Sequence, residues 1–323
     1  MSLTLLDFLQ LDLPAMLVAV LAALACGLPG NFLLLRRQGL IGDAISHVVL
    51  PGIVVGFLVS GSTGTTPMML GAGAAALLSV LLIELVRRLG GVDAEAAMGV
   101  VFTTMFAAGV VLLEQSGARD VHIDVQHSLY GNIEGTVWLG ASDWSALWDP
   151  AQLAELPGNI PRLIWVTALM VVLVVVFFKE LKLTTFDAGL ADSLGFSSRW
   201  LGFGLVVMTA VAAVAAFEAV GSILVIAMFI CPPATARMLT DSLAAQLWLS
   251  ALVAVLSGVL GYWLAAFGPF WVGMEHSLNA AGMVAVTGGG LQLLAMLLAP
   301  RYGVLARWWR ERGRGRSPTA PEA

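Results

Sequence analysis

The sequence predicts an all-α integral membrane protein with about nine transmembrane helices. Of its 323 residues, 59% are hydrophobic and only 11% are charged, whereas soluble domains carry about 25% charged residues. The apolar segments are about 20 residues long, which is the length that an α-helix needs to cross the hydrocarbon core. They do not alternate between apolar and polar residues, as the strands of a membrane β-barrel must. We therefore expect one helical transmembrane domain over residues 1–300.

The apolar segments that are long enough to span occupy residues 14–35, 40–60, 66–89, 94–115, 160–181, 199–217, 219–238, 243–267 and 279–300. If successive spans alternate in direction, all of the 16 Lys and Arg residues except Arg119 and Arg162 fall on one side. Cytoplasmic loops carry the excess of Lys and Arg. We therefore expect the N-terminus outside and the C-terminus in the cytoplasm, with a basic, disordered cytoplasmic tail over residues 301–323.

An acid and an imidazole lie four residues apart in the second segment. Asp43 and His47 share one face if this segment is a helix. An ionisable side chain inside a membrane costs about 2.5 kcal/mol or more, so it indicates function. A carboxylate and an imidazole together suit Mn, Fe or Zn, and we interpret the pair as a transient metal contact. Pro51 follows closely and is predicted to kink the helix.

The predicted outer loop, residues 116–160, is rich in Asp and Glu. It also contains His122 and His127. An acidic mouth raises the local concentration of cations and repels anions. The alternative, a solvated loop without a transport role, remains open from the sequence.

Residues 184–197 are predicted to form a short amphipathic helix on the cytoplasmic side. Thr184 or Thr185 would cap it, Asp187 would lie in its first turn, and Gly195 would end it. Its apolar residues at helical spacing are Phe186, Leu190, Ala191 and Leu194. Such a face suits a groove on a soluble partner. The alternative is a helix that lies on membrane lipid, against which its low Lys and Arg content argues.

The segment 219–238 contains two successive prolines, Pro232 and Pro233. Proline removes a backbone donor, so this pair is predicted to kink the helix. Glu218 lies at the outer edge of the same segment. It is either an interfacial carboxylate in water or a second contact for the cation.

Several of these stretches together resemble the membrane permease subunits of bacterial ABC importers for manganese, zinc and iron. They are Leu35–Gly52, Asp93–Thr103, Leu129–Asn132, Thr185–Asp187 and Val220–Ala236. The first is similar to the family's signature, and the fourth is similar to the start of its coupling helix. Two outer segments, 141–160 and 268–276, depart from the family pattern, so the resemblance does not extend to details of docking on the outer face.

The resemblance implies a fold similar to the vitamin-B12-type importer permeases. It also implies a second permease, either another copy of this chain or a related subunit. A cytoplasmic ATPase pair would dock on the helix Phe186–Phe196, and an extracytoplasmic metal-binding protein would deliver the metal. Asp43 and His47 match the family positions that line the metal path.

The sequence thus predicts a permease subunit of the bacterial plasma (inner) membrane that performs no chemistry itself. It contains no Walker A pattern, so ATP hydrolysis is expected in a separate subunit. No tightly bound cofactor and no nucleic-acid partner are expected, and the transported metal is Mn, Fe or Zn. The alternative is a proton-coupled secondary transporter that uses Asp43, His47 and Glu218. An intramembrane metalloprotease is disfavoured because no His-Glu-x-x-His motif occurs.

Overall fold

The computed structural model describes residues 5–62, 65–115, 131, 133–271, 273–274, 276–300 and 302–306. Within them, every element of regular secondary structure is a helix. The elements are α1 (Leu5–Asp7), η1 (Phe8–Asp12), α2 (Leu13–Leu35), α3 (Ile41–Ser60), α4 (Thr65–Gly90), α5 (Ala94–Gln115), η2 (Trp144–Leu147), α7 (Pro150–Leu153), α8 (Asn159–Val176), α9 (Phe178–Phe186), α10 (Ala188–Ser193), α11 (Ser198–Leu239), α12 (Leu243–Trp271) and α13 (Ala280–Leu298). His122, His127 and the segment 307–323 lie outside the described residues.

Within the described part of the chain, eight helices are long and apolar enough to cross a membrane. This confirms the predicted all-α membrane class, although the predicted count was about nine. The difference lies in residues 199–238, where two predicted spans form one segment, α11. That segment breaks at Gly221, whose φ of 74° and ψ of 171° are not helical. Only glycine adopts these angles readily, because any other residue would place a Cβ against the backbone.

The prolines do not mark the main break. α3 continues as a helix through Pro51, and α11 continues through Pro232 and Pro233. Proline fixes φ near the helical value, so the helix loses a hydrogen bond but keeps its backbone angles. The non-helical residue of α11 is Gly221 instead. The break lies three residues after the predicted boundary between the spans 199–217 and 219–238, and a kink at Pro51, Pro232 and Pro233 stays a prediction.

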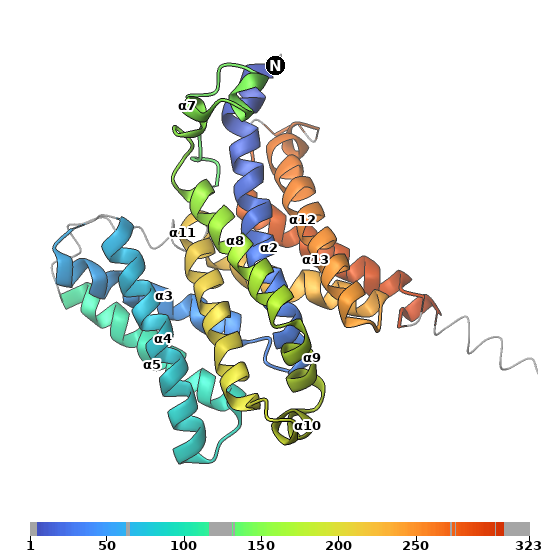
Figure 1. Ribbon diagram of the computed structural model, residues 1–323. Coiled ribbons are helices and arrows are strands. Elements are labelled where there is room, and N and C mark those ends of the chain that lie inside the picture. The colour runs from blue at the N-terminus through green and yellow to red at the C-terminus, as the bar shows by residue number, and fades with distance from the viewer. Residues whose placement is uncertain are drawn as a thin grey trace, which may run out of the picture.

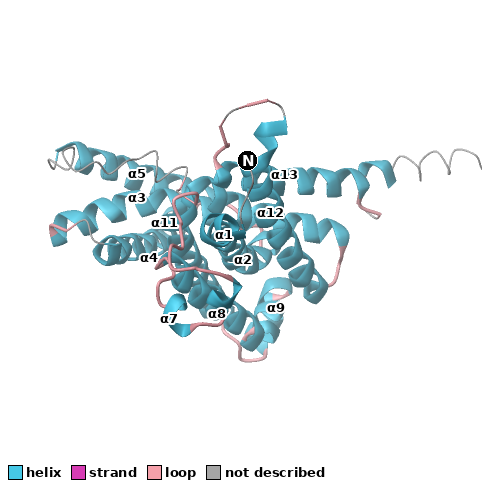
Figure 2. Ribbon diagram, turned by 90° about the horizontal axis from the view of Figure 1, so that it is seen from above, coloured by secondary structure: helices cyan, strands magenta, loops and turns pink. Residues whose placement is uncertain are grey.

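The helices form a central group with a flanking group on each side. In Figures 1 and 2, α2, α8 and α11 lie in the middle, α3, α4 and α5 lie on one side, and α12 and α13 lie on the other. The residues of α2 that pack into the core are mostly small, among them Ala15, Ala19, Ala22 and Ala23, each fully buried. Small residues let helices approach closely, which is how helices pack in a membrane.

Buried polar side chains connect the middle group to α12. Asn31 on α2 donates to the Ser250 hydroxyl at 3.0 Å, and Gln246 donates to the Asn31 amide oxygen at 3.1 Å. All three side chains are at most 1% exposed. Buried amides need such partners, because an unpaired polar group inside the protein costs about 1–3 kcal/mol.

The predicted outer and inner segments lie at opposite ends of the molecule (Figure 1). At one end, called the α7 end here, the N-terminus meets the loop before α8: the Trp138 amide donates to the Gln10 carbonyl at 2.8 Å. At the other, called the α10 end, α10 lies below the ends of α2 and α8 (Figure 1). Which end faces the cytoplasm stays a prediction.

Candidate functional site

α3 begins at Ile41, and its first turn lies on the second half of α11. Gly42 permits this approach, since a Cβ there would come within 2.6 Å of the Phe229 ring. One turn later, Ser46 is 2% exposed and donates its hydroxyl to the Gly42 carbonyl at 2.9 Å. These contacts hold one face of α3 against the core. Asp43 and His47 lie at the edge of that face and are partly exposed.

The structure brings Asp43 and His47 together, as their spacing predicts. His47 Nε2 lies 3.3 Å from Asp43 Oδ1, and the two side chains are 35% and 29% exposed, respectively. Asp43 lies in the first turn of α3. The N-terminus of a helix carries a partial positive charge, which stabilises a carboxylate at that position. The pair is therefore a preformed acid–imidazole contact whose two side chains are partly exposed on this chain.

Two aromatic rings of α5 hold the imidazole. Phe102 stacks on His47 with ring centroids 5.4 Å apart and an interplanar angle of 21°. Phe106 contacts the same imidazole edge-on, with centroids 6.0 Å apart. Such aromatic pairs stabilise their arrangement by about 0.5–1.5 kcal/mol beyond area burial. The rings limit the rotation of His47 and so keep Nε2 directed toward Asp43.

Asp43 and His47 supply two potential ligands from one chain. Among the described residues, no group of three or more His, Cys, Asp or Glu side chains is placed to hold a metal ion. His122 and His127, with residues 116–130 and 132 of the acidic outer loop, lie outside the described residues. A two-ligand site within a single chain leaves most coordination positions of a divalent metal to water or to other molecules.

Glu218, the other predicted cation contact, forms an ion pair with Arg162 of α8. Both side chains are about one-third exposed, at 36% and 30% respectively. The Arg162 guanidinium donates a hydrogen bond to Oε2 of the Glu218 carboxylate. The ion pair joins α8 to α11 three residues before the break at Gly221. A role for Glu218 in contacting the cation stays a prediction.

The inner segment predicted over residues 184–197 is divided between two helices. Thr184 and Thr185 lie inside α9, so they do not cap the next helix as predicted. Asp187 is the N-cap of α10 instead, because its carboxylate accepts the Leu190 amide at 2.9 Å. Gly195 follows α10 with a φ of 87°, a left-handed conformation that commonly ends helices.

Most side chains of the predicted apolar face at the α10 end are exposed. Phe186 is 57% exposed, Leu190 47% and Leu194 60%, and Phe196 adds a side chain that is 41% exposed. Ala191 is fully buried, so it does not belong to the exposed face. The reason is that Ala191 lies inside the reversal of the chain, where its carbonyl accepts the amides of Leu194 and Phe196.

Sequence reasoning missed the partners that hold these groups. Phe102 and Phe106 have helical spacing in an apolar segment, which is also the pattern of lipid-facing residues. Arg162 stood out only as one of two basic residues on the predicted outer side, and its partner Glu218 is 56 positions away. No local pattern could have paired them.

A family model described as the ABC 3 transport family matches residues 8–137 and 156–287. The chain belongs to this family. The manganese transport system membrane protein MntD of Bacillus subtilis (strain 168) is 40% identical over 288 residues, which cover 89% of this chain and 92% of MntD. The zinc transport system membrane protein TroD of Treponema pallidum (strain Nichols) is 38% identical over 297 residues, which cover 92% of this chain and 76% of TroD.

A solved structure also resembles this ABC 3 family protein. PsaBC from Streptococcus pneumoniae in complex with a Fab has a TM-score of 0.71 and 27% identity, and the match covers 93% of this chain and 94% of that chain. The resemblance read from the sequence motifs is thus confirmed. Together with its eight long apolar helices in the described residues, family membership makes this chain a multi-pass protein of the bacterial plasma (inner) membrane.

Proposed function

We propose that this ABC 3 family protein is the permease subunit of an ATP-driven importer that moves Mn, Fe or Zn into the cytoplasm. The relatives named for manganese and zinc transport support this cargo class. The observation that carries the proposal is the contact between Asp43 and His47, 3.3 Å apart within a membrane-spanning helix. The cation would touch this pair briefly on its way across the membrane.

The separation of the two ligand atoms suits one divalent cation. His nitrogen and carboxylate oxygen ligands each lie about 2.1 Å from a bound transition metal. Two such bonds to atoms 3.3 Å apart meet at roughly 100°, between the octahedral and tetrahedral angles. His47 must be neutral to bind, so the metal would displace any proton on Nε2. The pair would give the cation a transient contact and not a closed four-ligand cage, so that the cation can be released.

The chain would work as part of an assembly. A second permease, either another copy or a related subunit, would contribute its own ligands across a two-fold axis. A separate ATPase subunit would dock on the exposed apolar face of Phe186, Leu190 and Leu194. Hydrophobic side chains on a short helix are a common means of seating it in a partner's groove. An extracytoplasmic metal-binding protein would deliver the cation at the α7 end.

Uptake of radioactive Mn and Zn into proteoliposomes tests this function. The chain is reconstituted alone and then together with its candidate ATPase and metal-binding protein. We expect uptake only when both partners and ATP are present. Uptake by the chain alone that follows a pH gradient would overturn the proposal and establish a proton-coupled transporter. ATP hydrolysis by the complete assembly without uptake of Mn, of Zn or of Fe tested in the same way would exclude this cargo class.

A further inference from the structure

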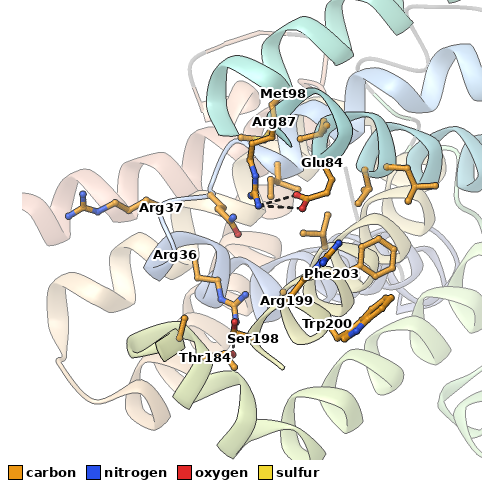
Figure 3. A pocket seen from close by; sticks show the side chains of 18 of the residues that line it. Arg36, Arg37, Glu84, Arg87, Met98, Thr184, Ser198, Arg199, Trp200 and Phe203 are labelled. Carbon is orange, nitrogen blue, oxygen red and sulfur yellow. Dashed lines mark hydrogen bonds and ion pairs between the residues drawn. The ribbon is translucent and has the colours of Figure 1, made fainter. Parts of the chain in front are cut away.

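A cleft of about 930 Å³ opens at the α10 end, between α4, the α2–α3 turn and the start of α11. We call it the arginine cleft, because five arginines line it: Arg36, Arg37, Arg87, Arg88 and Arg199. Among the described residues that line the cleft, the one acidic side chain is that of Glu84. Figure 3 shows the cleft with most of these side chains.

Glu84 does not neutralise the whole cleft. It pairs with the two arginines of its own helix, Arg87 at 3.1 Å and Arg88 at 2.5 Å. Within the described residues, Arg199 has no ion-pair or hydrogen-bond partner for its side chain, and Arg36 has no carboxylate partner. No anion among the described residues compensates these two guanidinium groups or that of Arg37, whose side chain extends away from them (Figure 3).

Arg36 is fixed in place by neutral groups. Its guanidinium donates to the Thr184 hydroxyl at 2.7 Å and to the Thr185 hydroxyl at 3.1 Å. Its Nη1 atom lies beside Gly202, where a Cβ would approach it to 3.2 Å. Burial lowers the pKa of Arg36 from its ordinary value. A guanidinium has five N–H donors, so the two threonines leave three of them unused.

The walls of the cleft are apolar. Leu81 and Leu85 of α4 are 57% and 51% exposed, and Phe203 of α11 is 36% exposed. Trp200, at 71% exposed, lies close to Phe203 and Arg199 in Figure 3. Tryptophan favours the depth of lipid headgroups. Arginine side chains at the ends of spanning helices, next to an apolar wall, suit a lipid that has an anionic headgroup and an apolar acyl chain.

We propose that the arginine cleft binds one anionic phospholipid, with its phosphate on Arg36 and Arg199 and an acyl chain along Leu81 and Leu85. Arginine is suited to phosphate, since its parallel N–H groups bind two oxygens at once. Basic pockets between spanning helices on the cytoplasmic side are typical sites for anionic headgroups. An acidic protein segment could pair with the arginines, but it would leave the exposed leucines without an apolar partner.

Native mass spectrometry of the purified chain in detergent tests this site. Phosphatidylglycerol or cardiolipin is added, and phosphatidylcholine of the same chain length serves as the neutral comparison. We compare the wild type with Arg199→Gln and with the double variant Arg36→Gln/Arg199→Gln. Arg37→Gln is the matched control, because it removes the same charge from the rim while its side chain extends away from Arg36 and Arg199 (Figure 3).

We expect the wild type and Arg37→Gln to retain one anionic lipid per chain and little phosphatidylcholine. Arg199→Gln should reduce retention about tenfold, as expected for the loss of about 1.4 kcal/mol. Arg199 is exposed, so this variant should fold even if Arg36→Gln does not. Equal retention of both lipid classes, or equal loss in Arg37→Gln, would overturn the proposal.

Further experiments distinguish a phospholipid from free phosphate, and from the ATPase, as the ligand of the cleft. Millimolar inorganic phosphate should not displace the lipid, because it cannot contact Leu81 and Leu85; complete displacement would indicate a simple anion site. A Leu81→Gln/Leu85→Gln variant should lose the lipid as well. If the wild type retains anionic lipid no better than the double variant, and only the wild type binds the candidate ATPase, the arginines serve that partner and the lipid proposal is wrong.

Discussion

Gly131, in the loop between α5 and η2, lies directly against the backbone of Val220. A Cβ on Gly131 would come within 2.3 Å of the Val220 carbonyl carbon and within 2.7 Å of the Gly221 nitrogen. Gly131 and Gly221 both have positive φ, 70° and 74° respectively. The loop and the helix break therefore fit together through two glycines. Beside this contact, Arg162 and Glu218 join α8 to α11.

Replacing Gly221 by alanine should destabilise the protein. A non-glycine residue at φ 74° and ψ 171° carries a strain of about 1–3 kcal/mol. We expect a lower Tm in detergent, measured by intrinsic fluorescence. Gly204→Ala is the matched control, since Gly204 is on the same helix and has nothing within 4 Å of a Cβ. An equal Tm for the two variants would contradict the account of the break.

Replacing Phe102 by alanine should loosen His47. The stacked ring limits the imidazole to the orientation that faces Asp43, and its loss allows other rotamers. In reconstituted uptake we expect KM for the metal to rise about threefold to tenfold, equivalent to about 0.7–1.4 kcal/mol. Phe102→Leu keeps the apolar volume and should show a smaller change. An unaltered KM in both variants would mean that the stacking does not position His47.

Charging the exposed face at the α10 end should release the ATPase. The double variant Phe186→Asp/Leu190→Asp places two carboxylates where we expect a hydrophobic groove to close, at a desolvation cost of several kcal/mol. Size-exclusion chromatography should show the permease eluting without its ATPase. Ser193→Asp is the control, because it adds charge to the exposed end of the same helix without removing an apolar side chain. Retention of the complex in the double variant would count against docking at α10.

Removing the N-cap of α10 should loosen that helix locally. The Asp187 carboxylate accepts the Leu190 amide, and replacing a helix cap by alanine costs about 1 kcal/mol. Hydrogen exchange in Asp187→Ala should be several-fold faster at residues 189–194 but unchanged in α2. Asp187→Asn retains a side-chain acceptor and should restore most of the protection. Protection that is the same in all three proteins would show that the cap is unimportant.

The sequence predicted the features that depend on short spacing. Hydropathy located the long helices, and the i, i+4 rule placed Asp43 beside His47. It failed where the outcome depends on residues distant in the chain. Hydropathy placed the boundary between two spans near residue 218, but it could not single out Gly221, whose unusual angles are visible only in three dimensions.

The cap of α10 shows the same limit on a smaller scale. Thr184 and Thr185 are good N-cap residue types, yet both are inside α9, where their hydroxyls accept hydrogen bonds from Arg36. The arginine lies 148 positions before Thr184. Asp187, a residue expected in the first turn, takes the cap instead. Local propensity identified the start of the helix to within a few residues, but it could not show that both threonines bind a distant arginine.

The central claim is that Asp43 and His47 jointly contact the transported cation. Its most direct test is ATP-driven Mn uptake, measured below KM in the reconstituted assembly, for Asp43→Asn, His47→Gln and the double variant. We predict at least a tenfold loss for each single change, about 1.4 kcal/mol, and little further loss in the double variant, because the two act on one ion. Glu95→Gln removes a carboxylate from the first turn of the neighbouring helix α5 and should transport normally. Normal uptake by Asp43→Asn, with the complex intact, would contradict the claim.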